Sequence, residues 1–262
     1  MNKVLRVLFL ISLAIFLIPI WFIPLRSIMG AWPYPSILPE DWNYSFWTLL
    51  FSGGDLSKSL FSSLILSLSV ALFATLGGFL LSRSIFGGEK DKSQSLLIFA
   101  YLPFLISPVL YAACLYFFFV KFELSASWPG VFIAQIFIAL PYSLILWSGF
   151  WTKRTRDLEQ QSRSLGASSL QTFKKVILPY AGGLLFVCFF QCFIISWFEF
   201  GLSQMIGVGQ VKTLTILVYQ FVQSANPAQA ATAAALLLLP PIILLFAQKE
   251  LLFPESGIFE RN

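Results

Sequence analysis

The chain has 262 residues, of which 58% are hydrophobic and only 11% are charged, and its formal net charge is +5. An ordinary soluble domain carries about 25% charged residues, whereas an uninterrupted apolar run of about 20 residues can cross a bilayer as a helix. Such runs recur along this sequence, so its composition excludes an ordinary soluble domain and predicts an all-α polytopic membrane protein.

Six apolar runs are predicted to form transmembrane helices within a single domain covering residues 1–262. These predicted spans are residues 7–25, 59–82, 95–120, 127–151, 180–198 and 228–248. A secretory signal peptide is the competing interpretation of the first run, which follows a short basic segment. Signal peptides have apolar cores of about 7–15 residues. The run at 7–25 is longer, and no small-x-small cleavage site follows it, so we expect an uncleaved span.

Residues 26–58 are predicted to form a structured external loop on the membrane surface. The segment contains several prolines, Trp32, Trp42 and Trp47, with little charge, and tryptophan is enriched at membrane–water interfaces. Within this loop, residues 46–51 are predicted to form a short interfacial helix.

The next three spans contain residues that affect helix packing. The second span is rich in serine, and small side chains let helices approach closely in lipid, so packing is favoured over substrate contact for these serines. The third span contains Pro103 and Pro108 and the fourth contains Pro141. Because proline lacks a backbone N–H, these positions predict kinks.

Between the fifth and sixth spans, residues 201–227 have a mixed composition. Several glycines interrupt the segment, and its apolar stretch at 214–222 is too short to cross a bilayer. This pattern favours a loop with an interfacial or re-entrant segment.

The basic residues are unevenly distributed between the loops on the two sides of the predicted spans. Thirteen fall on the side of both termini: Lys3, Arg6, Arg83, Lys90, Lys92, Lys153, Arg154, Arg156, Arg163, Lys174, Lys175, Lys249 and Arg261. Four fall on the other side: Arg26, Lys58, Lys121 and Lys212. The positive-inside rule therefore places both termini in the cytoplasm. It also explains the basic charge better than nucleic-acid binding does.

The segment 152–179 is the longest polar interruption in the second half of the chain, and it reads as two short helices separated by Gly166. Ser168 and Gln171 have the spacing of a capping box, so the second helix is predicted to begin after Ser168. In that helix Leu170, Phe173 and Ile177 form an apolar stripe. Docking into a groove on a partner and resting on anionic lipid are equally compatible with this pattern.

The run Leu158-Glu-Gln-Gln-Ser-Arg-Ser-Leu-Gly-Ala-Ser168, continuing to Val176-Ile-Leu-Pro179, resembles the EAA signature of bacterial binding-protein-dependent ABC importer permeases. In that family the signature is Glu-Ala-Ala, three residues, Gly, nine residues and Ile-x-Leu-Pro, and its loop forms a coupling helix in a cleft of the ATPase subunit. The resemblance also covers the six spans and places the loop between the fourth and fifth. It implies an ATPase-coupling loop with these residues: Glu159, Gln160, Gln161, Ser162, Arg163, Gly166, Ala167, Ser168, Leu170, Phe173, Leu178 and Pro179.

This sequence departs from the family signature at its acidic position. Aligned on Gly166, Gln160, Gln161 and Ser162 replace Glu-Ala-Ala. Glu159 lies one residue earlier and is expected to point about 100° away on a helix. Gln160 can still hydrogen-bond to an ATPase but cannot supply a negative charge.

The sequence contains no Walker A motif, so we expect a separate subunit to bind and hydrolyse ATP. The resemblance implies two ATPase subunits, a second permease chain (a copy or a paralogue) and a soluble or tethered substrate-binding protein, in the bacterial inner membrane. Rigid-body rocking of the spans would then alternate access to the substrate. We expect no catalytic residue, metal or cofactor in this chain, which lacks histidine.

Glu199 lies where the fifth span ends, and an ionisable group at membrane depth is a candidate functional residue. The run Glu199-Phe-Gly201 resembles the corresponding part of permeases for ferric iron, thiamine, polyamines and sulfate, which implies a pathway or gate position. Gln191 and Ser196 lie on roughly the same helix face and are candidates for the same path. Solvation of Glu199 at the outer interface and helix packing by Gln191 and Ser196 are the competing interpretations.

A stand-alone secondary transporter or channel is the alternative function. Such a protein would be expected to have repeated halves or broken spans in matching positions, and it would not need the polar loop. An intramembrane enzyme is disfavoured, because the sequence has neither histidine nor a Gly-x-Ser-x-Gly motif.

Overall fold

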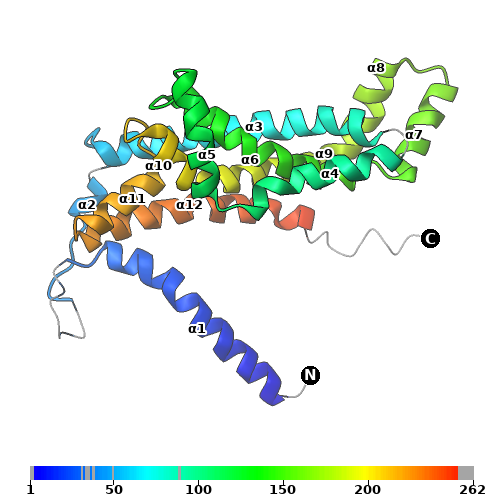
Figure 1. The fold of residues 1–262 in the computed structure, drawn as a ribbon. Helices are drawn as coiled ribbons and strands as arrows, with labels where there is room; N and C mark the ends of the chain where they lie inside the picture. The colour runs from blue at the N-terminus through cyan, green and yellow to red at the C-terminus, as the bar shows by residue number, and fades with distance from the viewer. Residues whose placement is uncertain are drawn as a thin grey trace. The chain divides into compact units, whose positions relative to one another are not determined.

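The computed structural model describes residues 3–30, 32, 36, 39–48, 50–87 and 90–252. The tail beyond Leu252, which includes Arg261, lies outside the described residues. Within them the chain is helical and contains no strand; an isolated antiparallel bridge joins Met29 and Trp42. The helices are α1 (Lys3–Ser27), α2 (Ser45–Thr48), α3 (Asp55–Phe86), α4 (Lys90–Leu105), α5 (Pro108–Lys121), α6 (Trp128–Ser148), α7 (Lys153–Ser164), α8 (Ser169–Thr172), η1 (Phe173–Ile177), α9 (Leu178–Trp197), α10 (Gly201–Gly207), α11 (Leu214–Gln223) and α12 (Pro227–Leu252) (Figure 1).

Among the described residues, five continuous helices are long and apolar enough to cross a membrane, and a bent pair would make a sixth. The five are Leu5–Ser27, Asp55–Phe86, Trp128–Ser148, Ser169–Trp197 and Pro227–Phe246. The predicted class, an all-α polytopic membrane protein with about six spans, is therefore confirmed. Residues 201–227 form the short helices α10 and α11 between the last two long ones.

The bent pair replaces the kinked third helix that the sequence predicted. The apolar stretch Leu97–Leu105 and α5 meet at 104°, so the chain breaks here and does not merely bend. Ser107 is the N-cap of α5 and Pro108 occupies its first turn. Proline is tolerated at that position, because its missing N–H would have no partner within the helix.

The first of two compact units contains residues 1–62 and 212–241. Ser27, at the end of α1, accepts a hydrogen bond from the Trp47 indole at 3.3 Å on its side-chain oxygen, and its backbone oxygen accepts one from Thr232 at 3.5 Å. Lys212 and Asp55 form an exposed ion pair at 3.0 Å. These contacts connect α1, the loop after it, α3 and α12 within this unit.

The second unit contains residues 63–211 and 242–262, and close packing of α3 on α6 forms part of its core. A Cβ on Gly78 would collide with the side chain of Ser143, whereas one on Gly77 would meet the flexible end of Leu140 at 3.1 Å. Small residues on α3 therefore let the two helices approach closely, as expected for packing in lipid. The buried Ser63, Ser67 and Ser82 side chains of α3 fit this packing role.

An aromatic cluster surrounds Phe79 near the end of α3. Its ring lies 4.6 Å from that of Trp147, 6.1 Å from that of Trp151 and 5.7 Å from that of Phe173. The Trp151 indole also donates a hydrogen bond to Ser82 at 2.9 Å. The cluster therefore joins α3 to the end of α6 and to η1, which lies within the polar segment 152–179.

Candidate functional site

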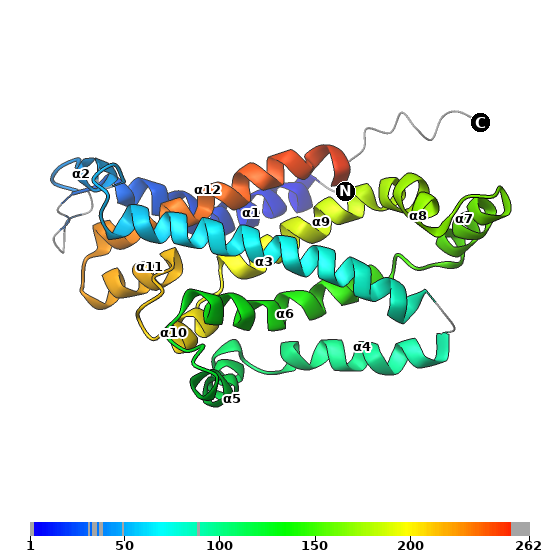
Figure 2. The same ribbon diagram turned by 90° about the horizontal axis from the view of Figure 1, so that it is seen from above.

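The polar loop 152–179 projects at one end of the second unit, where α7 and α8 are seen in both orientations of the ribbon (Figures 1 and 2). Thr152 caps α7 by accepting a hydrogen bond from the amide of Thr155. The Thr155 hydroxyl is buried and donates to the backbone oxygen of Phe150 at 2.6 Å, which fixes the start of α7 to the residues that follow α6.

Gly166 ends α7 in the left-handed conformation, with φ of +84°. Its amide donates to the Arg163 oxygen at 2.9 Å, and the Ala167 amide donates to the Ser162 oxygen at 3.2 Å. This pair of bonds is the Schellman pattern, which glycine favours because it has no Cβ. The predicted break at Gly166 is confirmed, and its conformation makes a tight corner between α7 and α8.

The second helix of the loop begins as predicted with a complete capping box. The Ser168 amide donates to the Gln171 side chain at 2.9 Å, and the Gln171 amide donates to the Ser168 hydroxyl at 3.3 Å. The Ser162 and Thr172 hydroxyls lie 3.0 Å apart and join the two helices of the loop. Both ends of α7 are thus held by side-chain hydrogen bonds.

The predicted apolar stripe is divided between two environments. Leu170 is 62% exposed, whereas Ile177 is fully buried and Phe173 packs against Phe79. A π-helical stretch at 173–177 follows α8, and its wider turn changes the register that a regular helix would keep. Leu170, which precedes this stretch, faces outward, and Phe173 and Ile177 hold the loop against the protein.

Helix formation continues without a break from Ser169 to Trp197, so the loop passes directly into the next long helix. Pro179 lies in the first turn of α9 and is exposed, and Leu178 before it is 39% exposed. A movement of the loop can therefore pass directly into α9.

Glu159 is turned toward the protein and is paired with two arginines. Its Oε1 atom lies 2.7 Å from Nη2 of Arg83 on α3 and 2.9 Å from Nη2 of Arg163 one turn later on α7. The Glu159 side chain is 18% exposed, which leaves little of the carboxylate for an outside partner. As expected from their positions on the helix, Gln160 is exposed while Glu159 is not.

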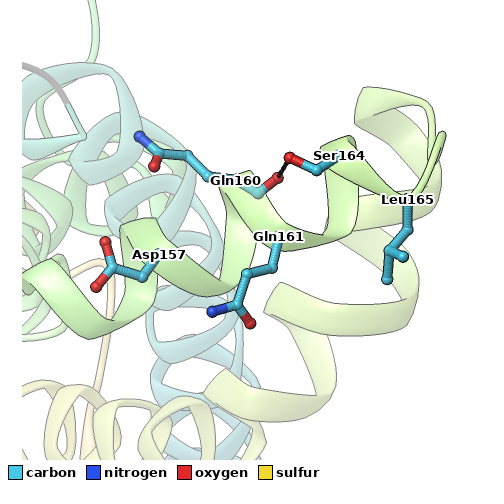
Figure 3. Close-up of a pocket in the computed structure, with 5 residues that line it drawn as sticks. All are labelled: Asp157, Gln160, Gln161, Ser164 and Leu165. Carbon is cyan, nitrogen blue, oxygen red and sulfur yellow. Dashed lines mark hydrogen bonds between the residues drawn. The ribbon is translucent and has the colours of Figure 1, made fainter.

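The outward face of α7 carries neutral polar side chains, one carboxylate and one large apolar side chain. A hollow of about 600 Å³ is lined by Asp157, Gln160, Gln161, Ser164 and Leu165 (Figure 3). Ser164 donates its hydroxyl hydrogen to the Gln160 backbone oxygen at 3.0 Å. Leu165 is 90% exposed and points away from the end of the helix. Such a side chain has lost little contact with water in the folded chain, so a partner that covers it would gain most of the free energy of burying a leucine.

Glu199 joins a second cluster, at the other end of α9. Its Oε1 atom accepts a hydrogen bond from the Leu202 amide at 2.6 Å, and its Oε2 atom accepts from the amide and hydroxyl of Ser203 at 2.9 and 2.8 Å. The carboxylate therefore caps the first amides of α10. Gln135 on α6 donates to Ser203 at 2.9 Å and accepts from Ser196, which links α6, α9 and α10.

The structure brings together two of the three predicted pathway residues. Ser196 and Glu199 share the Gln135 network, whereas the contacts of the described residues do not extend this network to Gln191, which is half-buried on α9. Sequence reasoning missed Gln135 and Ser203. A single glutamine inside the otherwise apolar run at 128–148 was a signal for the first, because a buried amide needs partners.

Known proteins with a related sequence or fold are membrane transport proteins. The family model for the binding-protein-dependent transport system inner membrane component matches residues 1–255. A probable sulfate transport system permease protein of Chlorella vulgaris is 36% identical over 97 residues, which make up 36% of this chain and 36% of that protein. The trehalose transport system permease protein SugB of Mycobacterium tuberculosis is 25% identical over 168 residues, or 62% of this chain and 59% of that protein.

These alignments thus span between about a third and three fifths of the length of the two relatives. A solved structure has a similar fold along nearly the whole chain. It is the crystal structure of a bacterial ABC transporter involved in the import of the acidic polysaccharide alginate, with a TM-score of 0.62 at 17% identity. The match covers 95% of this chain and 93% of that one.

Proposed function

Since this chain belongs to the binding-protein-dependent transport system inner membrane component family, we propose that it is the permease subunit of an ATP-binding-cassette importer. The whole chain, residues 1–262, would act as one transmembrane domain of the bacterial inner membrane, with both termini and the polar loop in the cytoplasm. It would form part of the substrate pathway, and a separate subunit would hydrolyse ATP.

The observation that carries this proposal is the shape of the polar loop. Its α7 and α8 project as a corner closed by Gly166, with Leu165 90% exposed beside the hollow lined by Gln160 and Gln161. An exposed leucine on a rigid corner suits a groove on a protein partner, where burial of its side chain stabilises the complex. Phe173 and Ile177 face the protein and are not free to insert into lipid. If the loop rested on a lipid surface, its other outward side chains would have to make the contact.

The proposed partners are two ATPase subunits, a second permease chain and a substrate-binding protein. Closure of the ATPase subunits on ATP would move the polar loop, and the uninterrupted helix Ser169–Trp197 would carry that movement into the membrane domain. Rigid-body rocking of packed helices is an established way to alternate access to a binding site.

For the substrate pathway we propose the region of Gln191, Ser196 and Glu199. Glu199 is held by the amides at the start of α10 and by Gln135, so its first role there would be to fix α10 against α6 and α9. A gate built on this cluster would move α10 together with the end of α9.

Mass spectrometry of the native protein purified in mild detergent tests the proposal. We expect an ATPase subunit at about one copy per permease chain, as the EAA-type loop implies. Recovery of the chain alone, with transport retained in vesicles that lack ATP, would refute the importer assignment and favour a secondary transporter.

Replacement of Leu165 with Asp tests the role of the loop. Full burial of a leucine stabilises a complex by about 1.5–3 kcal/mol, so Leu165→Asp should weaken ATPase binding by about tenfold or more. Phe51 is 91% exposed and lies outside the loop, which makes Phe51→Gln a matched control that should bind normally. Equal ATPase recovery from both variants would contradict the docking role of the loop.

A further inference from the structure

The ion pairs of Glu159 connect the polar loop to α3, a helix distant from it in sequence. Arg83, near the end of α3, donates from Nη2 to Glu159 Oε1 at 2.7 Å, and Arg163 donates to the same oxygen at 2.9 Å. The side chains of Arg83 and Glu159 are 30% and 18% exposed. Partial burial reduces the solvent screening that weakens fully exposed ion pairs.

An aromatic contact strengthens the same connection. The Arg83 guanidinium lies 5.5 Å from the centre of the Phe173 ring, within the distance at which a cation is attracted to an aromatic face. Phe173 in turn lies 5.7 Å from Phe79, one turn before Arg83 on α3. Arg83 is thus held between the two halves of the loop, with Glu159 on one side and Phe173 on the other.

The other anchors of the loop lead elsewhere. Thr155 joins α7 to Phe150 beyond the end of α6, and Ser162 joins α7 to Thr172 on α8. Neither contact involves α3, which runs as one continuous helix of 32 residues from Asp55 to Phe86. Of these anchors of the loop, the Arg83 ion pair and the Phe173 ring make the connection to α3.

The outward face of α7 is separate from this connection. Gln160, Gln161 and Leu165 are exposed, whereas the Glu159 carboxylate points to α3. Loss of the Arg83 side chain would therefore leave every residue of the proposed docking face in place, and Glu159 would keep its pair with Arg163. Docking and transmission can be separated experimentally for this reason.

We propose that Arg83 and Glu159 are positioning residues that couple movement of the polar loop to α3, and this inference rests on the proposed importer function. When an ATPase pulls on α7, the ion pair and the Phe173 ring make α3 follow. Without them the loop still docks and the ATPase still turns over, but less of the movement reaches the membrane helices. The defect would be uncoupling and not loss of assembly.

The test uses the full complex, reconstituted in lipid vesicles, with Arg83→Gln, Glu159→Gln and the double variant. Arg83→Gln, which changes a residue of α3 and not of the polar loop, should recover the ATPase at wild-type amounts, and each single variant should raise the ATP hydrolysed per solute transported by about tenfold, within the range found for contacting residues of one network. The double variant should be no worse than the more affected single one. Lys212→Gln, which breaks the exposed ion pair with Asp55, is the matched control and should remain coupled.

A reversible cross-link distinguishes positioning from a general effect on folding. Cysteines at positions 83 and 159, in a background whose native Cys114, Cys188 and Cys192 are replaced with serine, can be joined by a bifunctional thiol reagent with a disulfide in its spacer. Cross-linking should restore coupling, and reduction should abolish it again.

Wild-type coupling in the single variants, or a double variant whose defect is the product of the two single defects, would overturn the positioning role. So would a cross-linked protein that stays uncoupled. Failure of the wild-type chain to recover any ATPase is a different result, because it overturns the importer function itself and this inference with it.

Discussion

The proposed docking geometry should be most sensitive to a single substitution at Gly166. Its φ of +84° lies in the left-handed region, and a Cβ there would meet no atom within 4 Å. The cost of Gly166→Ala is therefore backbone strain alone, about 1–2 kcal/mol, which corresponds to a change of about five- to thirtyfold in an equilibrium constant. Proline is excluded more strongly, because its φ is fixed near −65° and it would remove the amide that donates to Arg163.

We expect Gly166→Ala to weaken ATPase binding within that range and Gly166→Pro to abolish ATPase association, while both variants insert into the membrane normally. The measurement is the ratio of ATPase to permease recovered from detergent, with the apparent dissociation constant for the alanine variant. Gly183→Ala is the matched control, since Gly183 lies in α9, where an added Cβ also meets no atom within 4 Å and alanine favours a helix. Normal complex recovery from Gly166→Pro would refute the assignment of this loop as the coupling element.

Two further predictions concern the membrane domain. Gly78→Ala should lower the thermal unfolding temperature, because overpacking against Ser143 costs about 1–3 kcal/mol. Gly77→Ala should be tolerated, since the end of the Leu140 side chain can move. Equal unfolding temperatures for the two variants would contradict the close contact between α3 and α6. Glu199→Gln should speed the hydrogen exchange of the α10 amides by about five- to thirtyfold. The variant loses one acceptor oxygen and charge-assisted hydrogen bonds worth about 1–2 kcal/mol. Unchanged hydrogen exchange, measured by mass spectrometry, would show that the carboxylate does not hold α10.

The features that could be predicted from sequence are those determined by neighbouring residues. The capping box of Ser168 and Gln171 needs only a local turn, and it forms as predicted. The break at Gly166 likewise follows from the conformational freedom of one residue. The all-α membrane class follows from the lengths of the apolar runs, because the bilayer requires helices of that length.

Contacts between residues distant in sequence could not be predicted in the same way. Arg83 and Glu159 are 76 positions apart, and nothing in either neighbourhood indicates that they meet. The π-helical stretch that starts at Phe173 was also not predictable from helical periodicity. Periodicity also indicates only which residues share a face and not what covers them, since Leu170 is 62% exposed whereas Phe173 packs against Phe79.

The position of Glu159 on α7 explains the departure from the family signature at Gln160. A step of one residue rotates a side chain by about 100° around a helix, which is enough to move a carboxylate from the exposed face of α7 to the face that meets Arg83. At position 160 a glutamate would be available to a partner, whereas at position 159 it is mostly buried between two arginines. The signature therefore carries over the place of the loop in the chain and its corner at Gly166, but not the contact made by its acidic residue. At the signature position itself, the proposed docking surface offers the neutral amides of Gln160 and Gln161 beside Leu165 and the Asp157 carboxylate, while the charge of Glu159 serves the connection to α3.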